Sequence, residues 1–465
     1  MWWMLNRLYR DIAFVKNRGA FRHETSTGTR RVSTEDDDGL TGDYSIRILT
    51  LNVWGLYFLS HVEKRIDAIC RKLDGYDVVA LQEVWHSRER DVLRDAARSY
   101  GMIYAHYFAC GVGAPFWPGS HGTGLLILSK LPIDDVIWKR FLVNGKPYKL
   151  HHSDYLAGRG VGLLRLSSPC GPIDFYVTHL HAMYAHTPED DEYQAHRVGQ
   201  AFEAAQFIRA TARAPLVLVL GDFNCWPNSV PMDLMRQFVR LKDGWENCNA
   251  GDVEKPGAGC TFGASDNCFS FKSNVPPERL DYILYVMLST PHRRAGIRWA
   301  IRECSVVTDF MDDSEKGQLP LSDHWGVQAV FTGAKSDSSP NFGKLPVDVL
   351  QWPLDEVSQM DWGLMKKAVN ICISGRKEAD CRRSNHHKRA VFALLLFPLL
   401  WVMGVDIPDV FSFAPFLVSG YAFVEMLLAQ GVVTDEITAF SEILHQMRHH
   451  LRASERIGSS LDVDL

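Results

Sequence analysis

The segment APLVLVLGDFNCWP, residues Ala214–Pro227, contains five consecutive leucine and valine residues at Leu216–Leu220, bounded by a proline and a glycine. This length and composition predict a strand that is buried on both faces. Asp222 and Asn224 follow the strand two residues apart, so both side chains can leave it on one side, at the carboxyl edge where α/β sheets keep their sites. The pair suits a hard cation or a polarised water, or else forms only an Asx turn after a core strand. Residues elsewhere in the chain decide between these interpretations.

Two strands predicted earlier in the chain end in the same way. Ser45–Val53 alternates apolar residues and delivers Asn52 at its end, and Tyr76–Val84 carries Glu83 near its end. A carboxylate that closes an apolar strand is costly unless it is paired or binds a cation. Both strands therefore end in oxygen ligands, which is what a magnesium site requires.

Three later predicted strands also carry polar residues at their ends. These are His179 in IDFYVTHLHA, Asp281 at the start of RLDYILYV, and Asp323 and His324 in the turn of LSDHWGVQAVF. A lone histidine at a strand end is more often a structural residue, and an adjacent Asp and His before a strand can be a turn device. With the other polar strand ends already collected, catalysis is the better interpretation.

The composition of the whole chain limits the class of protein. At 465 residues the chain is too long for one ordinary core, which predicts a large catalytic domain and a separate region. A net charge of -5 argues against a nucleic-acid binder that relies on a broad basic surface, so no nucleic-acid partner is expected. Ten cysteines without a CxxC pair or a regular spacing favour a reduced compartment.

Two segments outside the predicted strands have the character of membrane contacts. In residues 1–43, charged residues interrupt the apolar positions, so no secretory signal is expected there. Their helical spacing fits an interfacial helix, a short packed helix ahead of a polar tether, or a mitochondrial presequence. Tyr104–Pro118 holds Phe116 and Trp117 between two prolines. Exposed loop aromatics are typical of membrane or ligand contact, and a loop folded back onto the domain is the alternative.

The composition changes after Gly333, where AKSDSSPNFGKLP predicts a linker. Two uncharged runs follow, 390–405 and 410–433, the second interrupted only by Glu425. They predict a transmembrane or re-entrant helical hairpin, with a buried soluble hairpin as the alternative. Basic residues flank the hairpin on both sides, so the catalytic domain and the tail are expected in the cytosol, at an intracellular membrane or the inner leaflet of the plasma membrane. The expected organisation is an N-terminal segment (1–43), a catalytic domain (44–333), a linker and basic juxtamembrane segment (334–389), a hydrophobic hairpin (390–433) and a cytosolic tail (434–465).

Taken in order, the polar strand ends form the series N, QE, TH, GDFN, RLDY and SDH. This series resembles the endonuclease/exonuclease/phosphatase superfamily, the fold of deoxyribonuclease I, over about Tyr44–Gly333. The resemblance implies an α/β (α+β) four-layered sandwich, in which two packed mixed β-sheets are flanked by helices. It also implies cleavage of a phosphodiester with Mg²⁺.

Within the superfamily, the chain is most similar to the neutral sphingomyelinases with a membrane-bound C-terminus. The similarity is carried by HYF at 106–108, VTHLHA at 177–182, TPEDDEY, AHRVGQAFEAAQFI at 195–208, RLDYILY and LSDHWG. His179 discriminates only weakly, because some nucleases that resemble this fold share the histidine. Related sphingomyelinases carry an Asp and a Lys five residues apart at one loop, whereas this chain has Asp154 and Arg159. An arginine still binds phosphate, bidentately and without titrating.

The resemblance and the demands of the reaction together imply a role for each site residue. Glu83 is the expected Mg²⁺ ligand, with Asn52 and Asp323 assisting through coordinated water. His324, oriented by Asp281, is the expected general base on the attacking water. The other residues act at the water and the phosphate: Asp222 and Asn224 position the water or protonate the leaving oxygen, and His179 and Arg159 hold phosphate oxygens.

The expected function is Mg²⁺-dependent, phospholipase C type hydrolysis of sphingomyelin, or of a related phosphosphingolipid, to ceramide and a phosphorylated headgroup such as phosphocholine. A phospholipase C specific for lysophospholipids and a nuclease of the same fold are the rival enzymes. The negative charge and the membrane anchor disfavour the nuclease. A catalytically dead membrane scaffold is disfavoured because every motif residue is present. The headgroup, the organelle and the oligomeric state stay open at this point.

Overall fold

The computed structural model describes residues 44–56, 61–109, 122–149, 152, 154–185, 190–255, 257–271, 276–289, 297–312, 319–335, 350–351, 361–406 and 413–461. Residues 1–43, the aromatic pair Phe116 and Trp117, and most of the predicted linker therefore lie outside the described residues.

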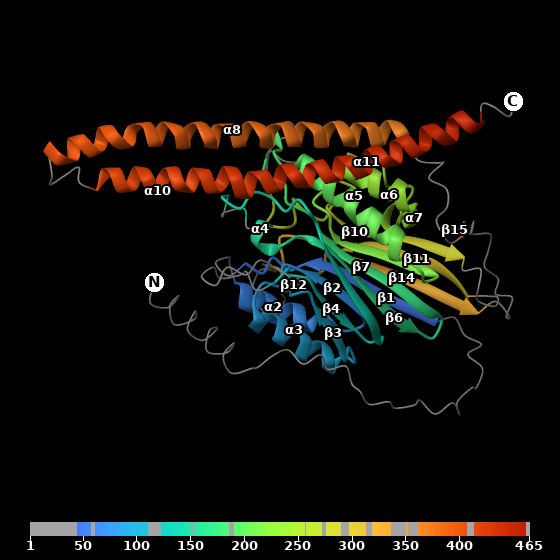
Figure 1. Ribbon diagram of the computed structural model, residues 1–465. Helices are drawn as coiled ribbons and strands as arrows, with labels where there is room; N and C mark the ends of the chain where they lie inside the picture. Colours follow the sequence, from blue (N-terminus) through green and yellow to red (C-terminus); the bar gives the residue numbers. More distant parts are fainter. Residues whose placement is uncertain are drawn as a thin grey trace.

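Two β-sheets form the centre of the molecule (Figure 1). The first sheet has the strand order β11 (Ile297–Val307), β14 (Gly326–Lys335), β1 (Tyr44–Asn52), β2 (Val78–Gln82), β4 (Leu126–Ser129) and β3 (Tyr104–Tyr107). The second has the order β15 (Leu350–Gln351), β10 (Asp281–Ser289), β8 (Leu216–Asp222), β7 (Gly171–His179), β6 (Gly160–Ser168) and β5 (Ile133–Arg140), with β9 (Lys242–Asp243) beside β10. A small ribbon pairs β12 (Met311–Asp312) with β13 (Leu319–Pro320). Because β1 pairs with β2 in parallel and β7 with β8 in parallel while most other pairs are antiparallel, both sheets are mixed.

The strand β8 shows how the layers are built. Every residue of β8 is buried, as the apolar run predicts. Leu216, Leu218 and Leu220 pack into the core between the sheets. Val217 and Val219 point the opposite way, because successive side chains alternate across a strand, and pack beneath helices α5 (Gln194–Thr211) and α6 (Val230–Val239). Each such side chain contributes about 1.5–3 kcal/mol by leaving water.

The outer face of the first sheet is covered in the same way. Leu49 and Leu81 pack against Ile66 of α2 (Val62–Arg71) and Leu93 of α3 (Ser87–Ser99). The order of layers is therefore helices, sheet, sheet, helices, with the short helices α4 (Asp154–Ala157) and α7 (Gly244–Cys248) at the periphery. The predicted class, two packed mixed β-sheets flanked by helices, is confirmed.

The strand pairing brings the polar strand ends to one edge. His179 of β7 lies opposite Asp222 of β8, and Asp222 lies opposite Asp281 of β10. Gly221 has φ +138°, and a Cβ there would overlap the carbonyl oxygen of Thr178. Only glycine fits this close approach of β7 and β8, so the glycine that ends the apolar run also allows the ends of β7 and β8 to meet.

Two long helical rods form the C-terminal region (Figure 1). Helix α8 (Trp362–Asp406) runs over 45 residues with Pro398 inside it. Helix α10 (Ala414–Leu427), a π-helical turn η4 (Leu428–Val433) and helix α11 (Thr434–Leu461) follow one another directly and pack along α8. The helical stretch Ala414–Arg452 is long and apolar enough to cross a membrane, judged by length and composition. It overlaps the second predicted apolar run.

Candidate active site

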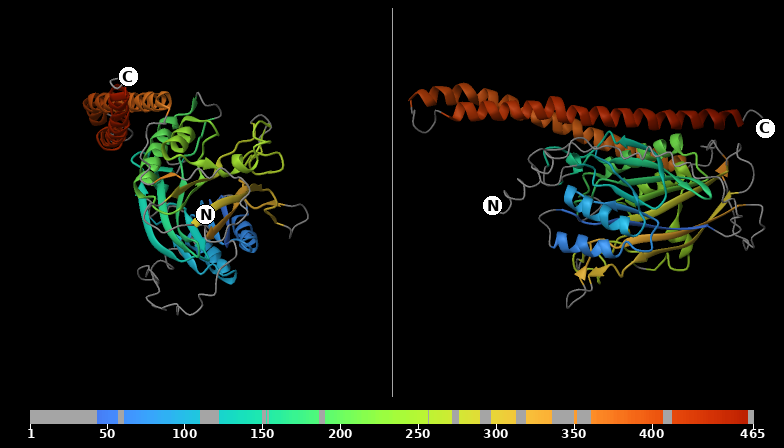
Figure 2. Two further views of the ribbon diagram at one scale, coloured as in Figure 1. Left: turned by 90° about the vertical axis from the view of Figure 1, so that its right-hand side faces the viewer. Right: turned by 90° about the horizontal axis from the view of Figure 1, so that it is seen from below.

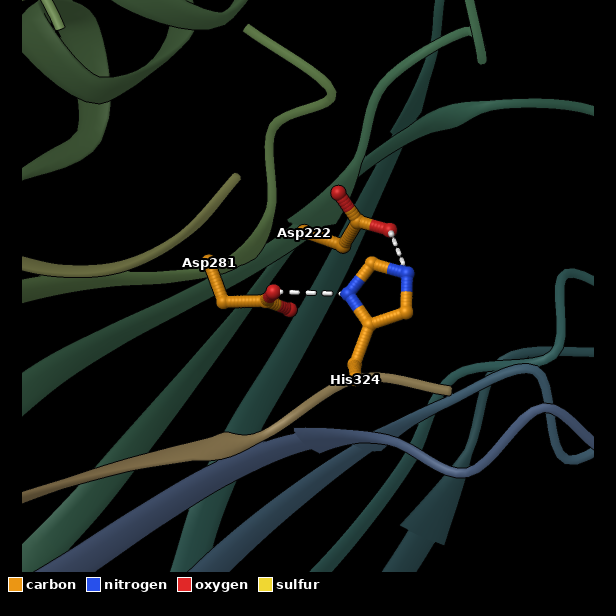
Figure 3. A group of neighbouring side chains, drawn as sticks. All are labelled: Asp222, Asp281 and His324. Atoms are coloured by element: carbon orange, nitrogen blue, oxygen red, sulfur yellow. Dashed lines mark hydrogen bonds and ion pairs between the residues drawn. The ribbon is translucent and has the colours of Figure 1, made fainter. Parts of the chain in front are cut away.

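His324 lies between two carboxylates at the edge where the strands end (Figure 3). Its Nδ1 atom is 2.7 Å from Oδ2 of Asp281, and its Nε2 atom is 4.0 Å from Oδ2 of Asp222. All three side chains are buried. Burial lowers the pKa of His324, but the charges of Asp281, Asp222 and Asp323 outweigh it, so this pKa lies well above its ordinary value. The arrangement orients the imidazole and stabilises a proton that it takes up.

Oδ2 of Asp222 lies close to the side chains of several other site residues. Nε2 of His179 lies 3.3 Å from it, and Nδ2 of Asn52 donates to it at 3.0 Å. Oδ1 of the same carboxylate accepts from the backbone N–H of Asn224 at 2.9 Å, which is the Asx turn that the sequence allowed. Burial raises the pKa of Asp222, but the neighbouring His179, His324 and Asn52 bring it well below its usual range. Asp222 therefore stays ionised at neutral pH and is suited to positioning groups rather than to donating a proton.

Glu83 and Asp323 form a second acidic centre beside the first. Oε1 of Glu83 accepts from Nδ2 of Asn52 at 3.3 Å, while its buried Oε2 has no hydrogen-bond partner among the described residues. Desolvation raises the pKa of Asp323 to about 7, with the charge of Glu83 adding to it and His324 and Arg65 opposing it. Two carboxylates close enough to oppose each other's ionisation, one with an unpaired buried oxygen, fit a hard divalent cation. Asn52 contacts Glu83 through its NH₂ group, since its Oδ1 accepts from the N–H of Trp54.

Asp222, Asp281 and His324 also have the composition of a metal site, because one ligand atom of each lies within 4.8 Å of the others. Direct contact between His324 and Asp281 at 2.7 Å argues against that assignment. Two ligands of one ion, each at about 2.1 Å, do not also hydrogen-bond each other directly through the same atoms. Nδ1 of His324 and Oδ2 of Asp281 therefore cannot both be ligands of one ion while this hydrogen bond is kept.

Arg159 lies at the same edge in a buried ion pair. Its Nε donates to Oδ1 of Asp154 at 2.6 Å, whereas its buried Nη1 has no hydrogen-bond partner among the described residues. Oδ2 of Asp154 accepts from the hydroxyl of Tyr184 at 2.6 Å. The charge of Glu83 is among the influences that raise the pKa of Arg159 against the effect of burial, so the guanidinium lies near the acidic centre. Nη1 is thus a donor available to an anionic ligand there.

Sequence reasoning missed Arg65, a buried residue of α2 that ties two parts of the site together. Its Nη1 donates to the carbonyls of Val53 and Leu321 at 2.9 Å each, and its Nη2 donates to the carbonyl of Trp54 at 2.8 Å. These carbonyls belong to the segments that carry Asn52 and Asp323. The available signal was an arginine at a position beside the inner stripe of an otherwise apolar helix face, since Val62 and Ile66 are its neighbours on that face.

The loop before β10 was also missed, because it showed no motif of its own. Oγ1 of Thr261 accepts from the backbone N–H groups of Leu280 and Asp281, at 3.0 and 3.2 Å. Nδ2 of Asn267 donates to the carbonyl of Ser322 at 3.0 Å. The loop therefore holds the backbone at Asp281 and, two residues before His324, at Ser322.

Three positions at this edge have left-handed backbone conformations without being glycine. They are Trp54, Glu83 and Asn224, with φ of 50°, 61° and 47°. Such conformations are costly for residues with a Cβ, and they gather where surrounding structure over-determines them, as at functional sites. They turn the chain sharply after β1, β2 and β8 and leave the polar side chains at the edge.

Comparison with known proteins finds sequence relatives and a solved structure that are similar to this chain. Sphingomyelin phosphodiesterase 2 of Rattus norvegicus is 34% identical over 298 residues, covering 62% of this chain and 64% of that protein. The inositol phosphosphingolipids phospholipase C of Saccharomyces cerevisiae is 30% identical over 350 residues, covering 66% of this chain and 70% of that protein. The chain thus spans less than two thirds of the rat protein. A crystal structure of beta toxin from Staphylococcus aureus aligns with a TM-score of 0.45 at 20% identity, covering 61% of this chain and 99% of that chain.

The family comparison covers the region that holds the site. The model of the Endonuclease/Exonuclease/phosphatase family matches residues 49–324, which begin within β1 and end at His324. This range includes the residues of the acidic centre, the pair of His324 and Asp281, and Arg159. Since the match spans more than half of the chain, the protein belongs to the endonuclease/exonuclease/phosphatase family.

Proposed function

We propose that this protein is a membrane-anchored neutral sphingomyelinase that depends on Mg²⁺. It hydrolyses the phosphodiester of sphingomyelin, or of a related phosphosphingolipid, to ceramide and a phosphorylated headgroup. The observation that carries the proposal is the buried His324, held by Asp281 and facing Asp222, beside an acidic centre with an unpaired oxygen on Glu83. The relatives named sphingomyelin phosphodiesterase and inositol phosphosphingolipids phospholipase C support the substrate class.

His324 is the proposed general base. Because Nδ1 is engaged by Asp281, Nε2 is the atom directed at the site, and it takes a proton from the attacking water. Asp222 orients that Nε2 and helps to hold the imidazolium once it forms. The carboxylate of Asp222 remains charged throughout, so we assign it and Asn224 to positioning the water.

The phosphate is held by the donors that have no protein partner. Nη1 of Arg159 donates to one non-bridging oxygen, and Nδ1 of His179, also buried without a partner among the described residues, is the group that faces another. Glu83, with Asp323 and Asn52 beside it, would hold a Mg²⁺ ion, which would supply Lewis-acid polarisation of the phosphodiester and offset the negative charge of the site.

The membrane side of the proposal rests on the C-terminal helices. The hairpin anchors the chain, and the catalytic domain and the tail face the cytosol because basic residues flank both apolar arms. The nine cysteines in the described part of the chain are free, which fits a reduced compartment. Phe116 and Trp117 are proposed to contact the lipid surface, although their loop lies outside the described residues.

The test is a substrate panel with the purified full-length protein. Sphingomyelin, inositol phosphosphingolipid, lysophosphatidylcholine and a DNA duplex are each assayed with Mg²⁺ and with a chelator. Mg²⁺-dependent release of the phosphorylated headgroup from a phosphosphingolipid supports the proposal, and the relative rates identify the headgroup. Cleavage of lysophosphatidylcholine alone or of DNA alone would assign one of the rival activities, and no turnover of any substrate would favour a scaffold.

A further inference from the structure

Helix α8 passes from the catalytic domain into the apolar arm without a break. Near its start, Met365, Ala368 and Cys372 are completely buried and belong to the core formed with α5 and α6. Further along the same helix, Phe392 is 63% exposed and Leu395 is 70% exposed. One rod therefore lies half in a protein core and half in surroundings that leave large apolar side chains uncovered. No loop among the described residues separates the two halves.

The returning arm has the same construction. Phe416, Leu417 and Phe423 of α10 are exposed, whereas Phe440, Ile443 and Met447 of α11 are fully buried in the core with α5. The helical path from α10 through η4 to α11 is continuous. Both arms therefore leave the catalytic domain as extensions of helices that are themselves part of its core (Figure 2).

Polar contacts and close packing fasten these helices to the domain. Oε1 of Glu436 on α11 lies 2.6 Å from Nη2 of Arg382 on α8 and 3.3 Å from Nε2 of His196 on α5. A Cβ on Gly375 of α8 would overlap Ala195 of α5. Three helices that share buried charges and approach at a glycine cannot slide or swing without breaking the core, because packed interiors resist deformation.

The root of the hairpin lies beside a loop of the active site. His386 of α8 is 2.5 Å from Glu425 of α10, a contact that joins the two arms where the exposed apolar residues begin. The ring of Tyr148 lies 6.0 Å from that of His386 in an edge contact. Tyr148 precedes α4, which carries Asp154, the partner of Arg159. The arms extend past the domain on the side where α4 lies (Figures 1 and 2).

We propose that the hairpin and the catalytic domain form one rigid body that holds the active site at the surface of the bilayer in which the hairpin is embedded. Residues 390–406 of α8, which follow the basic residues Lys388 and Arg389, span roughly 26 Å at 1.5 Å per residue, close to the thickness of about 30 Å of the hydrocarbon layer. With the arm in the bilayer, the boundary falls within about one helical turn of His386 and thus near the loop of Tyr148. The chain then hydrolyses lipid in the membrane that anchors it, and cannot reach lipid in a facing membrane. This inference rests on the proposed function.

The first test uses the unmodified full-length protein and two vesicle preparations. In one, the protein is reconstituted together with the sphingolipid substrate. In the other, protein in phosphatidylcholine vesicles is mixed with protein-free vesicles that carry the substrate. Hydrolysis at least tenfold slower in the mixture is expected. Equal rates in the two preparations would overturn the proposal.

The second test raises the domain above the membrane. A seven-residue polar helical segment is inserted after Arg389 in α8 and a second one before Ala422 in α10, on the membrane side of the contact between His386 and Glu425. Seven residues lengthen each arm by about 10 Å and rotate it by only about 20°, so the arms still face each other. We expect at least a tenfold loss on lipid in the same vesicle and unchanged activity on a soluble short-chain phosphosphingolipid.

The control carries the same segment appended after Leu465, and it should match the unmodified protein on both substrates. Unchanged activity on vesicle lipid in the variant with the two inserted segments would refute the proposal that the hairpin and the catalytic domain form one rigid body. Activity on the soluble substrate reports folding of the variant, and the vesicle-mixing experiment needs no variant. If the unmodified protein hydrolyses neither the vesicle lipid nor the soluble substrate, the proposed function fails. This result differs from every outcome that tests the rigid body.

Discussion

Replacing Asp281 with Asn tests whether His324 and Asp281 act as one unit. The change keeps the shape of the side chain but removes the carboxylate 2.7 Å from Nδ1 of the imidazole. A hydrogen bond between a buried charge and its partner is worth about 1.5–3 kcal/mol, which corresponds to a roughly tenfold to hundredfold loss of rate. His324→Ala removes the base itself and should cost about a hundredfold to ten-thousandfold.

The double variant decides between a unit and two independent residues. If Asp281 acts only through His324, the double variant is no slower than His324→Ala alone, because residues that act together are not additive. We would measure kcat/KM on a soluble short-chain phosphosphingolipid at saturating Mg²⁺. Two losses that multiply would refute the pairing. The matched control is Asp174→Asn, since Asp174 is a buried carboxylate at the other end of β7 that accepts from the N–H of Ala214. It should reduce stability and leave the kcat of the folded enzyme unchanged.

The pH dependence adds an independent readout for the same variant. Burial lowers the pKa of His324, while Asp281, Asp222 and Asp323 raise it to a net value above its ordinary range. Since a base acts in its deprotonated form, activity should be lost as the pH falls through this pKa. Removing the charge of Asp281 lowers the pKa, so the acidic limb of the rate profile should move to lower pH in Asp281→Asn. An unmoved limb would mean that another group sets it.

Three further predictions concern the cation, the fold and the hairpin. Glu83→Gln should weaken Mg²⁺ binding at least tenfold in calorimetry while leaving thermal unfolding without Mg²⁺ unchanged, because it removes a ligand charge and not a core contact; wild-type affinity would contradict the assignment. Burial raises the pKa of Glu436, but His196 and Arg382 bring it down to about 2, so its stabilisation is full above the unfolded pKa near 4.5 and is lost as the pH falls toward 2. Urea unfolding should therefore show a decline of about 3 kcal/mol over this window that Glu436→Gln lacks, and parallel curves would refute the pairing. Replacing residues 391–424 with a short Gly-Ser turn should give a folded protein that stays in the soluble fraction with wild-type activity on a soluble substrate, whereas ending the chain at 389 should unfold it, because α11 supplies buried core residues.

The sequence by itself determined the class of fold and which polar residues stand at the ends of the strands. The reason is that the evidence for them is local. Strand β8 is an unbroken apolar run, so its burial on both faces and the place where it ends follow from residues that are neighbours in the chain. The same holds for Glu83, because a carboxylate at the end of an apolar strand is costly wherever that strand lies. The order of these strand ends was enough to indicate the family.

Only the tertiary structure decided which of these residues touch one another. Asp222 contacts His179 through a parallel strand pair and lies opposite Asp281 through an antiparallel one, and neither pairing can be derived from local composition. The support given by Arg65 and Thr261 was invisible for the same reason, since each acts by hydrogen-bonding backbone groups of segments remote in the chain.

The C-terminal region shows this division most clearly. Apolar runs indicated the hairpin. The polar and charged residues between 375 and 389 carried no signal that one helix continues from Trp362 to Asp406. Its continuity depends on the burial of Met365 and Cys372 against α5 and on the partners that Arg382 finds on α11. Local composition sets where a helix can form, and burial against distant segments decides how far it extends.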